Sequence, residues 1–182
     1  DGERPVLLSL NYSDCPMLCN LQLRGLIDGL SKIEWTLGEQ FRVVTASINP
    51  QETPERAGKA QQNYVQSLGG EVTEDGWTLL TGKEEEIKAL ADAVGFRYEY
   101  VPERGEYAHT AALMICTPDG VISRYLYGIE YDPSTLRLST IEAADGKIGS
   151  AVDQLILYCF HYDATKGRYG PVAMNLMLVA AL

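Results

Sequence analysis

The sequence predicts an α/β fold with a mostly parallel central sheet, a terminal antiparallel hairpin and helices on both faces. Short apolar segments alternate with segments of helical periodicity in the order β-α-β-α-β-α-β-β-α, followed by one more helical segment, which is typical of parallel strands joined by crossover helices. The last two strand segments are separated only by TPDG, which favours a tight turn between antiparallel strands.

The first predicted strand is Val6–Tyr12, which is mostly apolar and shows no helical period. Apolar residues then recur at helical spacing between residues 18 and 33, which predicts an amphipathic helix. Ser13 or Asp14 is the expected N-cap of this helix, and Pro16 suits its first turn.

The middle of the chain repeats this alternation. The expected elements are a strand at Val43–Ile48, a helix at Pro54–Leu68, a strand at Trp77–Thr81 and a helix at Lys83–Val94. Glycines directly after both helices are typical C-terminal stops.

The last part of the chain begins with the predicted hairpin. Its strands are Ala111–Cys116 and Val121–Leu126, and two helices are expected at Thr135–Ala144 and Lys147–Phe160. The composition then changes, so we expect one domain over residues 1–162 and a tail over residues 163–182. The apolar end of that tail is far shorter than the roughly 20 residues that span a bilayer, and we expect it to lead to a membrane anchor.

The composition is that of a single globular domain. The chain has 182 residues, 46% of them hydrophobic, and a formal net charge of −10. The acidic surface argues against nucleic-acid binding, whereas it is compatible with a basic partner or with solubility alone.

The candidate site starts from Cys15 and Cys19 in the segment NYSDCPMLCN, between the first strand and the first helix. Helix amides and the helix dipole stabilise a thiolate at such a junction, so Cys15 is expected to have the lower thiol pKa. A spacing of four places both sulfurs on one helix face. Such a pair either closes a disulfide or binds a soft metal ion, and a third interpretation is a pair of buried core cysteines.

A third ligand would favour the metal interpretation. His109 stands just before a predicted strand and therefore at a sheet end, where it can reach the start of the first helix. Two thiolates and one imidazole suit Cu(I), and with a further ligand they suit Cu(II) or zinc. A dithiol oxidoreductase, by contrast, does not need His109.

Several segments in this order resemble the SCO/SenC family of thioredoxin-like copper chaperones. They are NYSDCPMLC, SINPQETPERAGKAQQNYV, GWTLLTGKEEEIKALADAVGFRY and HTAALMICTPDGVISRYLYG, which together span about residues 6–128. The resemblance implies a thioredoxin-like fold and copper, as Cu(I) or Cu(II), bound by Cys15, Cys19 and His109.

The resemblance also implies a function in cytochrome c oxidase assembly. Family members deliver copper to the CuA site of the oxidase or reduce the cysteines that build it, so the implied partners are the CuA subunit, other copper chaperones and thiol-disulfide reductants. It implies a membrane-anchored protein on the periplasmic side of the bacterial inner membrane. The alternatives are a thiol-disulfide oxidoreductase that cycles Cys15 and Cys19 without a metal, and a copper or redox sensor.

Three residues depart from the family pattern. Asn20 replaces the proline after the second cysteine, Ala108 replaces the acidic residue before the histidine, and Asn49 replaces the aspartate of the Asp-Pro segment. None removes a ligand, but the loss of a carboxylate beside His109 is expected to weaken Cu(II) binding or to reorient the ring.

The remaining sulfur and imidazole groups are expected to have other roles. Cys116 alternates with apolar residues on a predicted strand and is assigned to the core, and Met17 is expected to cover the site or act as a weak thioether ligand. A set that comprises Cys159, His161, Met174 and Met177 is assigned to packing, with a second copper site as the alternative.

Overall fold

This computed structural model describes residues 2–15 and 18–144, together with the backbone of 160–163 and 168–171. Five strands form the central sheet in the order β3-β2-β1-β6-β7. They are β1 (Val6–Asn11), β2 (Arg42–Ser47), β3 (Trp77–Leu80), β6 (Ala112–Cys116) and β7 (Ile122–Tyr127).

β6 is the one reversed strand of this sheet. β1 pairs in parallel with β2, and β2 with β3, whereas β6 is antiparallel to both β1 and β7. β7 therefore runs in the direction of β1, which confirms the mostly parallel sheet. The TPDG turn also forms as predicted, with Thr117 N donating to Val121 O at 2.8 Å.

The reversal of β6 has a direct consequence for the candidate site. In the antiparallel register Ser9 faces Leu113, so the start of β6 lies beside the end of β1. Segments that precede β6 and segments that follow β1 therefore meet at one edge of the sheet.

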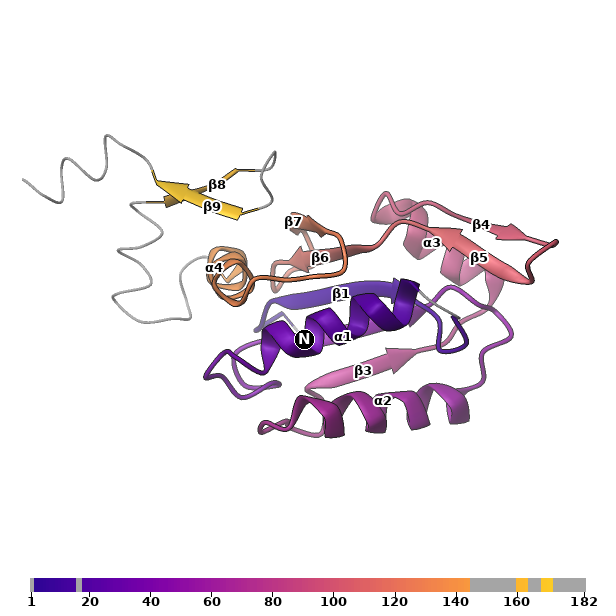
Figure 1. Ribbon diagram of the computed structural model, residues 1–182, viewed down its shortest axis with the longest axis horizontal. Coiled ribbons are helices and arrows are strands. Elements are labelled where there is room, and N and C mark those ends of the chain that lie inside the picture. Colours follow the sequence, from indigo (N-terminus) through magenta and orange to yellow (C-terminus); the bar gives the residue numbers. More distant parts are fainter. Residues whose placement is uncertain (1, 16–17, 145–159, 164–167, 172–182) are drawn as a thin grey trace, which may run out of the picture.

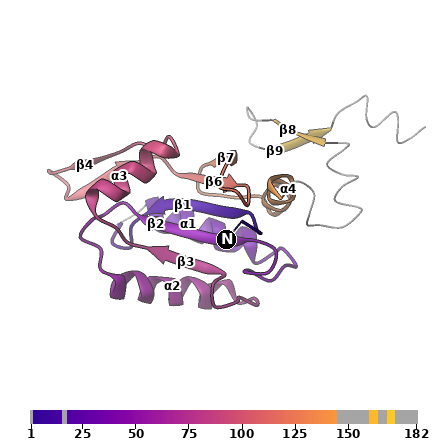
Figure 2. The same ribbon diagram turned by 180° about the vertical axis from the view of Figure 1, so that it is seen from behind.

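Helices cover both faces of the sheet, as predicted. They are α1 (Leu18–Leu30), α2 (Pro54–Leu68), α3 (Glu84–Ala93) and α4 (Pro133–Ala143). Leu7 packs in a core with residues of α1 and α4, whereas its neighbour Leu8 packs in a second core with residues of α3. Figure 1 shows α1 in front of the sheet, and Figure 2 shows α3 in front when the molecule is turned around. The thioredoxin-like prediction is consistent with this architecture.

Two glycines let α1 pack closely against the chain that follows β7. A β-carbon on Gly25 would overlap the carbonyl oxygen of Ile129 and lie 2.9 Å from its carbon. A β-carbon on Gly29 would lie 2.7 Å from the carbonyl oxygen of Tyr131. The absence of side chains at these two positions therefore sets the distance between α1 and residues 129–131.

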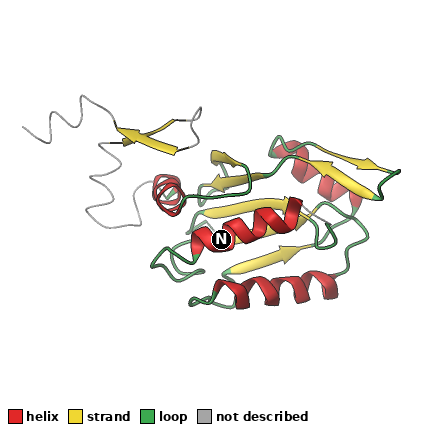
Figure 3. Cartoon of the chain, in the orientation of Figure 1, coloured by secondary structure: helices red, strands yellow, loops and turns green. Residues whose placement is uncertain are grey.

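A hairpin outside the central sheet was not anticipated from the sequence. β4 (Tyr98–Val101) and β5 (Glu106–His109) pair antiparallel in a separate two-stranded sheet. Figure 3 shows this hairpin projecting beside α3. It ends at His109 and so carries that side chain to the edge where β6 begins.

Other boundaries differ from the expectation by a few residues. α4 begins at Pro133, because the Asp132 side chain accepts a hydrogen bond from Thr135 N. Ser13 and Asp14 lie in a turn and α1 is described from Leu18, so neither residue directly precedes the described helix as its N-cap.

The C-terminal part is described only as a hairpin of β8 (Phe160–Asp163) and β9 (Arg168–Pro171). Phe160, the expected end of a helix, is the first residue of β8, and residues 147–159 of that helix lie outside the described residues. The expected domain boundary after residue 162 falls within β8 and stays a prediction. Among the described residues, no helix combines the length and the apolar character needed to cross a membrane.

Candidate metal centre

Both cysteines lie where β1 passes into α1. The loop after Asn11 closes with Cys15 N donating to Tyr12 O at 3.3 Å. Cys15 and Cys19 are 6% and 1% exposed, and both are free thiols. The backbone amide of Cys19 donates to Cys15 Sγ at 3.3 Å, which is the contact that stabilises a thiolate at the start of a helix.

His109 completes the cluster from the end of the β4–β5 hairpin. Its Nε2 lies 2.9 Å from Cys19 Sγ, although the two residues are 90 positions apart in the chain. The two sulfurs and an imidazole nitrogen all lie within 4.8 Å of one another. The structure thus brings together all three residues that the sequence singled out.

The second ring nitrogen of His109 fixes the orientation of the imidazole. Nδ1 lies 3.1 Å from the carbonyl oxygen of Thr110. Because a carbonyl only accepts, Nδ1 carries the proton and the lone pair of Nε2 faces the sulfurs. A backbone carbonyl therefore supports the ring where the family pattern has a carboxylate and this chain has Ala108.

Burial favours the neutral forms of Cys19 and His109 in the metal-free site. It raises the pKa of the Cys19 thiol, and a hydrogen bond with the Cys15 side chain raises it further. Burial also lowers the pKa of His109. At neutral pH the Cys19 thiol is therefore the donor to Nε2, and a bound metal ion must displace the thiol proton.

Aromatic rings hold His109 over the cysteines. Phe96 and Tyr12 lie against the imidazole, with ring centroids 5.8 Å and 6.4 Å from it. Tyr12 also meets Tyr107 edge-on at 5.5 Å and accepts a hydrogen bond from Tyr107 N through its hydroxyl at 3.2 Å. These contacts fasten the hairpin to the loop that carries Cys15.

Asn20 tightens the same loop from the helix side. Its Nδ2 donates to the carbonyl oxygen of Cys15 at 2.9 Å. A proline at this position, as in the family pattern, has no such donor. Asn20 therefore adds a hydrogen bond across the cysteine loop that a proline could not make.

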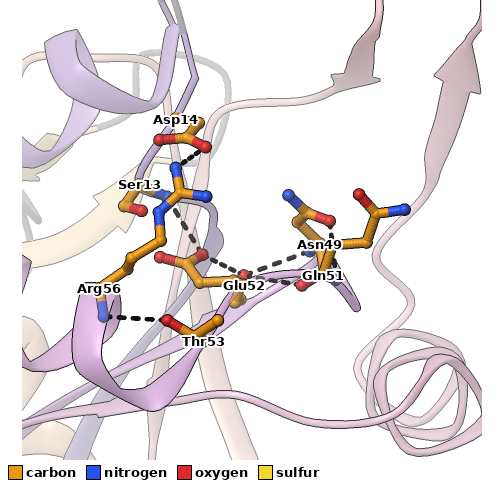
Figure 4. Close-up of polar contacts among 8 residues, drawn as sticks. Ser13, Asp14, Asn49, Gln51, Glu52, Thr53 and Arg56 are labelled. Carbon is orange, nitrogen blue, oxygen red and sulfur yellow. Dashed lines mark hydrogen bonds and ion pairs between the residues drawn. The ribbon is translucent and has the colours of Figure 1, made fainter.

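A second group of polar contacts reaches the loop from the segment between β2 and α2 (Figure 4). Ser13 N donates to Glu52 Oε2 at 3.2 Å, and Asp14 forms an ion pair with Arg56. Asn49, the third departure from the family pattern, accepts a hydrogen bond from Gln51 N through Oδ1 at 3.0 Å. Glu52 lies in a segment that resembles the family, but its residue type and spacing did not mark it as part of the site.

A groove of about 610 Å³ opens beside the centre. Its lining includes Asp14, Glu84 and the four tyrosines Tyr12, Tyr98, Tyr100 and Tyr107. The groove therefore borders the loop of Cys15 at Tyr12 and Asp14.

The other candidate residues do not join the described centre. Cys116 is 6% exposed and packs in the core beneath α3, as predicted. Met17, Cys159, Met174 and Met177 lie outside the described residues, and His161 lies in β8, where only the backbone is described. The alternative of a second copper site there stays a prediction.

The two sulfurs and one nitrogen fit a soft metal ion. Thiolate and imidazole donors in a buried, three-coordinate arrangement suit Cu(I), whereas hard cations prefer oxygen ligands. The alternative use of the same sulfurs is a Cys15–Cys19 disulfide.

Comparison with known proteins agrees with these observations. The SCO1/SenC family model matches residues 2–142. Among solved structures, a protein of Aquifex aeolicus VF5 assigned to electron transfer is 24% identical, with a TM-score of 0.69 over 79% of this chain and 80% of that one. Arabidopsis thaliana ScoI, solved with copper bound, is 19% identical, with a TM-score of 0.60 over 79% and 85%.

A third structure is BsSco, a Sco-family cytochrome c oxidase assembly protein in which a disulfide switch is described. It is 21% identical, with a TM-score of 0.57 over 80% of each chain. At these identities the structural matches show a common fold. No curated protein sequence matches this chain.

Proposed function

This chain belongs to the SCO1/SenC family, and on that premise we propose that it is a copper-binding chaperone for cytochrome c oxidase. In this proposal it binds copper through Cys15, Cys19 and His109, and it delivers the ion to the CuA site or reduces the cysteines of that site. The single observation that carries the proposal is the convergence of the three donor atoms within 4.8 Å.

Each donor has a defined part in binding. The two thiolates hold the soft ion, and His109 adds a neutral nitrogen whose direction is fixed by the bond to Thr110 O. The aromatic rings around His109 limit access of water to the thiolates. In this proposal a recipient protein docks at the groove beside the loop, which Tyr12 and Asp14 line, and its incoming ligands replace the three donors one at a time.

The decisive experiment is an anaerobic Cu(I) titration of the reduced protein in competition with a chromophoric chelator. We expect one copper per chain in the wild type, loss of binding in Cys15→Ser and Cys19→Ser, and weaker binding in His109→Ala. Serine replaces a soft thiolate with a hydroxyl that is a poor copper ligand. Cys116→Ser is the matched control, because this thiol is buried on β6 in the core; wild-type affinity in Cys15→Ser would refute the proposed site.

A thiol-disulfide oxidoreductase is the second candidate, because both sulfurs lie in one cluster. In that reaction the two thiols become a disulfide and pass two electrons and two protons to a partner disulfide, which becomes two thiols. His109→Ala separates the candidates: it should weaken copper binding but leave exchange with a disulfide substrate largely unchanged. A sensor, the third candidate, would bind a partner only in its copper-loaded or oxidised form and would transfer nothing.

For location and partners the proposal follows the family. It puts the protein on the periplasmic side of the inner membrane through a membrane anchor, where the oxidase subunit that carries CuA and thiol-disulfide reductants are accessible. Fractionation of cells that express the natural gene tests this, and recovery of the protein in the cytosol would contradict it.

A further inference from the structure

Glu52 is a buried carboxylate on the loop between β2 and α2. It is 7% exposed, and its Oε2 accepts hydrogen bonds from Ser47 Oγ and from the backbone amide of Ser13. Ser13 lies two residues before Cys15. Hydrogen bonds to a carboxylate are stronger than those between two neutral groups. One oxygen of Glu52 therefore joins the end of β2 to the cysteine loop.

The carboxylate is itself held in place by its own loop. Glu52 N donates to Asn49 O at 3.0 Å, and Asn49 N donates to Ser47 Oγ at 3.2 Å. Ser47 is the last residue of β2, so these contacts fix the position of Glu52 relative to the central sheet. Figure 4 shows the carboxylate of Glu52 turned toward Ser13.

Arg56 makes the second connection from the first turn of α2. Thr53 caps this helix by accepting from Arg56 N at 3.3 Å, and the guanidinium of Arg56 pairs with Asp14. The side chains of Arg56 and Asp14 are 45% and 53% exposed. Solvent screens such a pair, so the contribution of Arg56 is smaller than that of Glu52.

We propose that Glu52 and Arg56 are positioning residues of the metal centre, which hold the turn before Cys15 so that its sulfur faces Cys19 and His109. Neither side chain is one of the three donors. They fix the loop upstream of Cys15, while Asn20 and the amide of Cys19 fix it downstream. The proposal rests on the copper function, because it assigns Glu52 and Arg56 to the centre that binds copper.

The test compares Glu52→Gln with the wild type in two assays. Glutamine keeps the size of the side chain but lacks the charge, and loss of such a supporting contact typically weakens metal binding by about tenfold or more. We expect that loss in the Cu(I) titration, with one copper still bound. In glutathione redox buffers without copper, a looser loop should shift the Cys15–Cys19 equilibrium toward the dithiol by about threefold or more.

Two variants calibrate these effects. Arg56→Met should weaken Cu(I) binding by about fivefold at most, as expected for an exposed ion pair. Glu142→Gln removes a carboxylate that pairs with Arg124 between α4 and β7, away from the centre. It should lower the melting temperature while the copper affinity and the disulfide equilibrium stay at the wild-type values.

The proposal is overturned if Glu52→Gln loses thermal stability, as Glu142→Gln does, yet keeps wild-type copper affinity and disulfide equilibrium. If Glu52→Gln does not fold, Ser47→Ala replaces it, because it deletes one partner of the same carboxylate oxygen; unchanged affinity and equilibrium there overturn the proposal equally. If the wild type bound no copper, the proposed function would fail, whereas the disulfide equilibrium would still test the positioning role.

Discussion

Replacing Gly25 with alanine should destabilise the protein, although alanine is the better helix former. Gly25 lies in the interior of α1, where alanine is favoured over glycine by about 1 kcal/mol. The new methyl group, however, would overlap the carbonyl oxygen of Ile129 and lie 3.4 Å from the α-carbon of Glu130. Backbone atoms cannot rotate away, so α1 or residues 129–131 must move.

The net effect follows from these opposing contributions. An overlap with backbone atoms lies in the upper part of the overpacking range, about 2–3 kcal/mol, and the gain in helix propensity offsets about 1 kcal/mol of it. We expect a net loss of about 1–2 kcal/mol, which lowers the melting temperature by roughly 2–8 °C for a chain of this size. Gly58→Ala is the matched control: Gly58 lies in α2, and a β-carbon there would meet nothing within 4 Å, so the same substitution should stabilise by about 0.5–1 kcal/mol.

Urea unfolding and thermal melting of the wild type and both variants measure these differences. If Gly25→Ala lowers the stability and Gly58→Ala raises it, the result supports the close packing of α1 against the chain after β7. If Gly25→Ala were as stabilising as Gly58→Ala, the close approach of Ile129 would be refuted.

Three further predictions follow from burial and from the position of the centre. Without copper and under oxidising conditions, Cys15 and Cys19 should form a disulfide while Cys116 stays reduced, because Cys116 is buried on β6 outside the cluster of Cys15, Cys19 and His109; peptide mapping that finds Cys116 bridged to Cys15 would contradict this. Burial also raises the pKa of Tyr131 to about 12 from 10.0. As the pH rises, the unfolded state therefore loses this proton before the folded state does, and the free energy of unfolding falls. Between about pH 9 and pH 11 the wild type should lose about 1 kcal/mol more than Tyr131→Phe in urea unfolding, and equal losses would argue against a buried hydroxyl. A chain truncated after Ala144 should still bind one copper in the Cu(I) titration, because all proposed ligands precede that residue; loss of binding would assign the tail to the centre.

Much of the fold was predictable because the relevant signals are local. The apolar run of β1, the β-branched residues of β2 and the glycine that ends α2 each act within a few residues. The β4–β5 hairpin was missed because it is short and partly exposed, so it lacks an apolar run. The alternating aromatics around Tyr98 and Tyr100, followed by a glycine turn at Gly105, are the signal that indicates it.

The candidate centre was predictable to a different degree for each residue. Cys15 and Cys19 are four residues apart, so their spacing alone indicates a pair. His109 lies 90 positions from Cys19, and its proximity depends on the reversal of β6 and on the hairpin. Glu52 gave no signal, because a carboxylate in a polar turn is ordinarily exposed and only the tertiary structure buries it.

The reversed strand β6 also bears on biosynthesis. Cys19 is made 90 residues before His109, and the imidazole reaches both thiols only when β6 has docked beside β1. A nascent chain that ends before His109 therefore offers the two sulfurs without the imidazole. Under the proposed function, full affinity for copper requires a completed sheet, and bound copper would in turn favour the folded protein over partly folded forms by mass action.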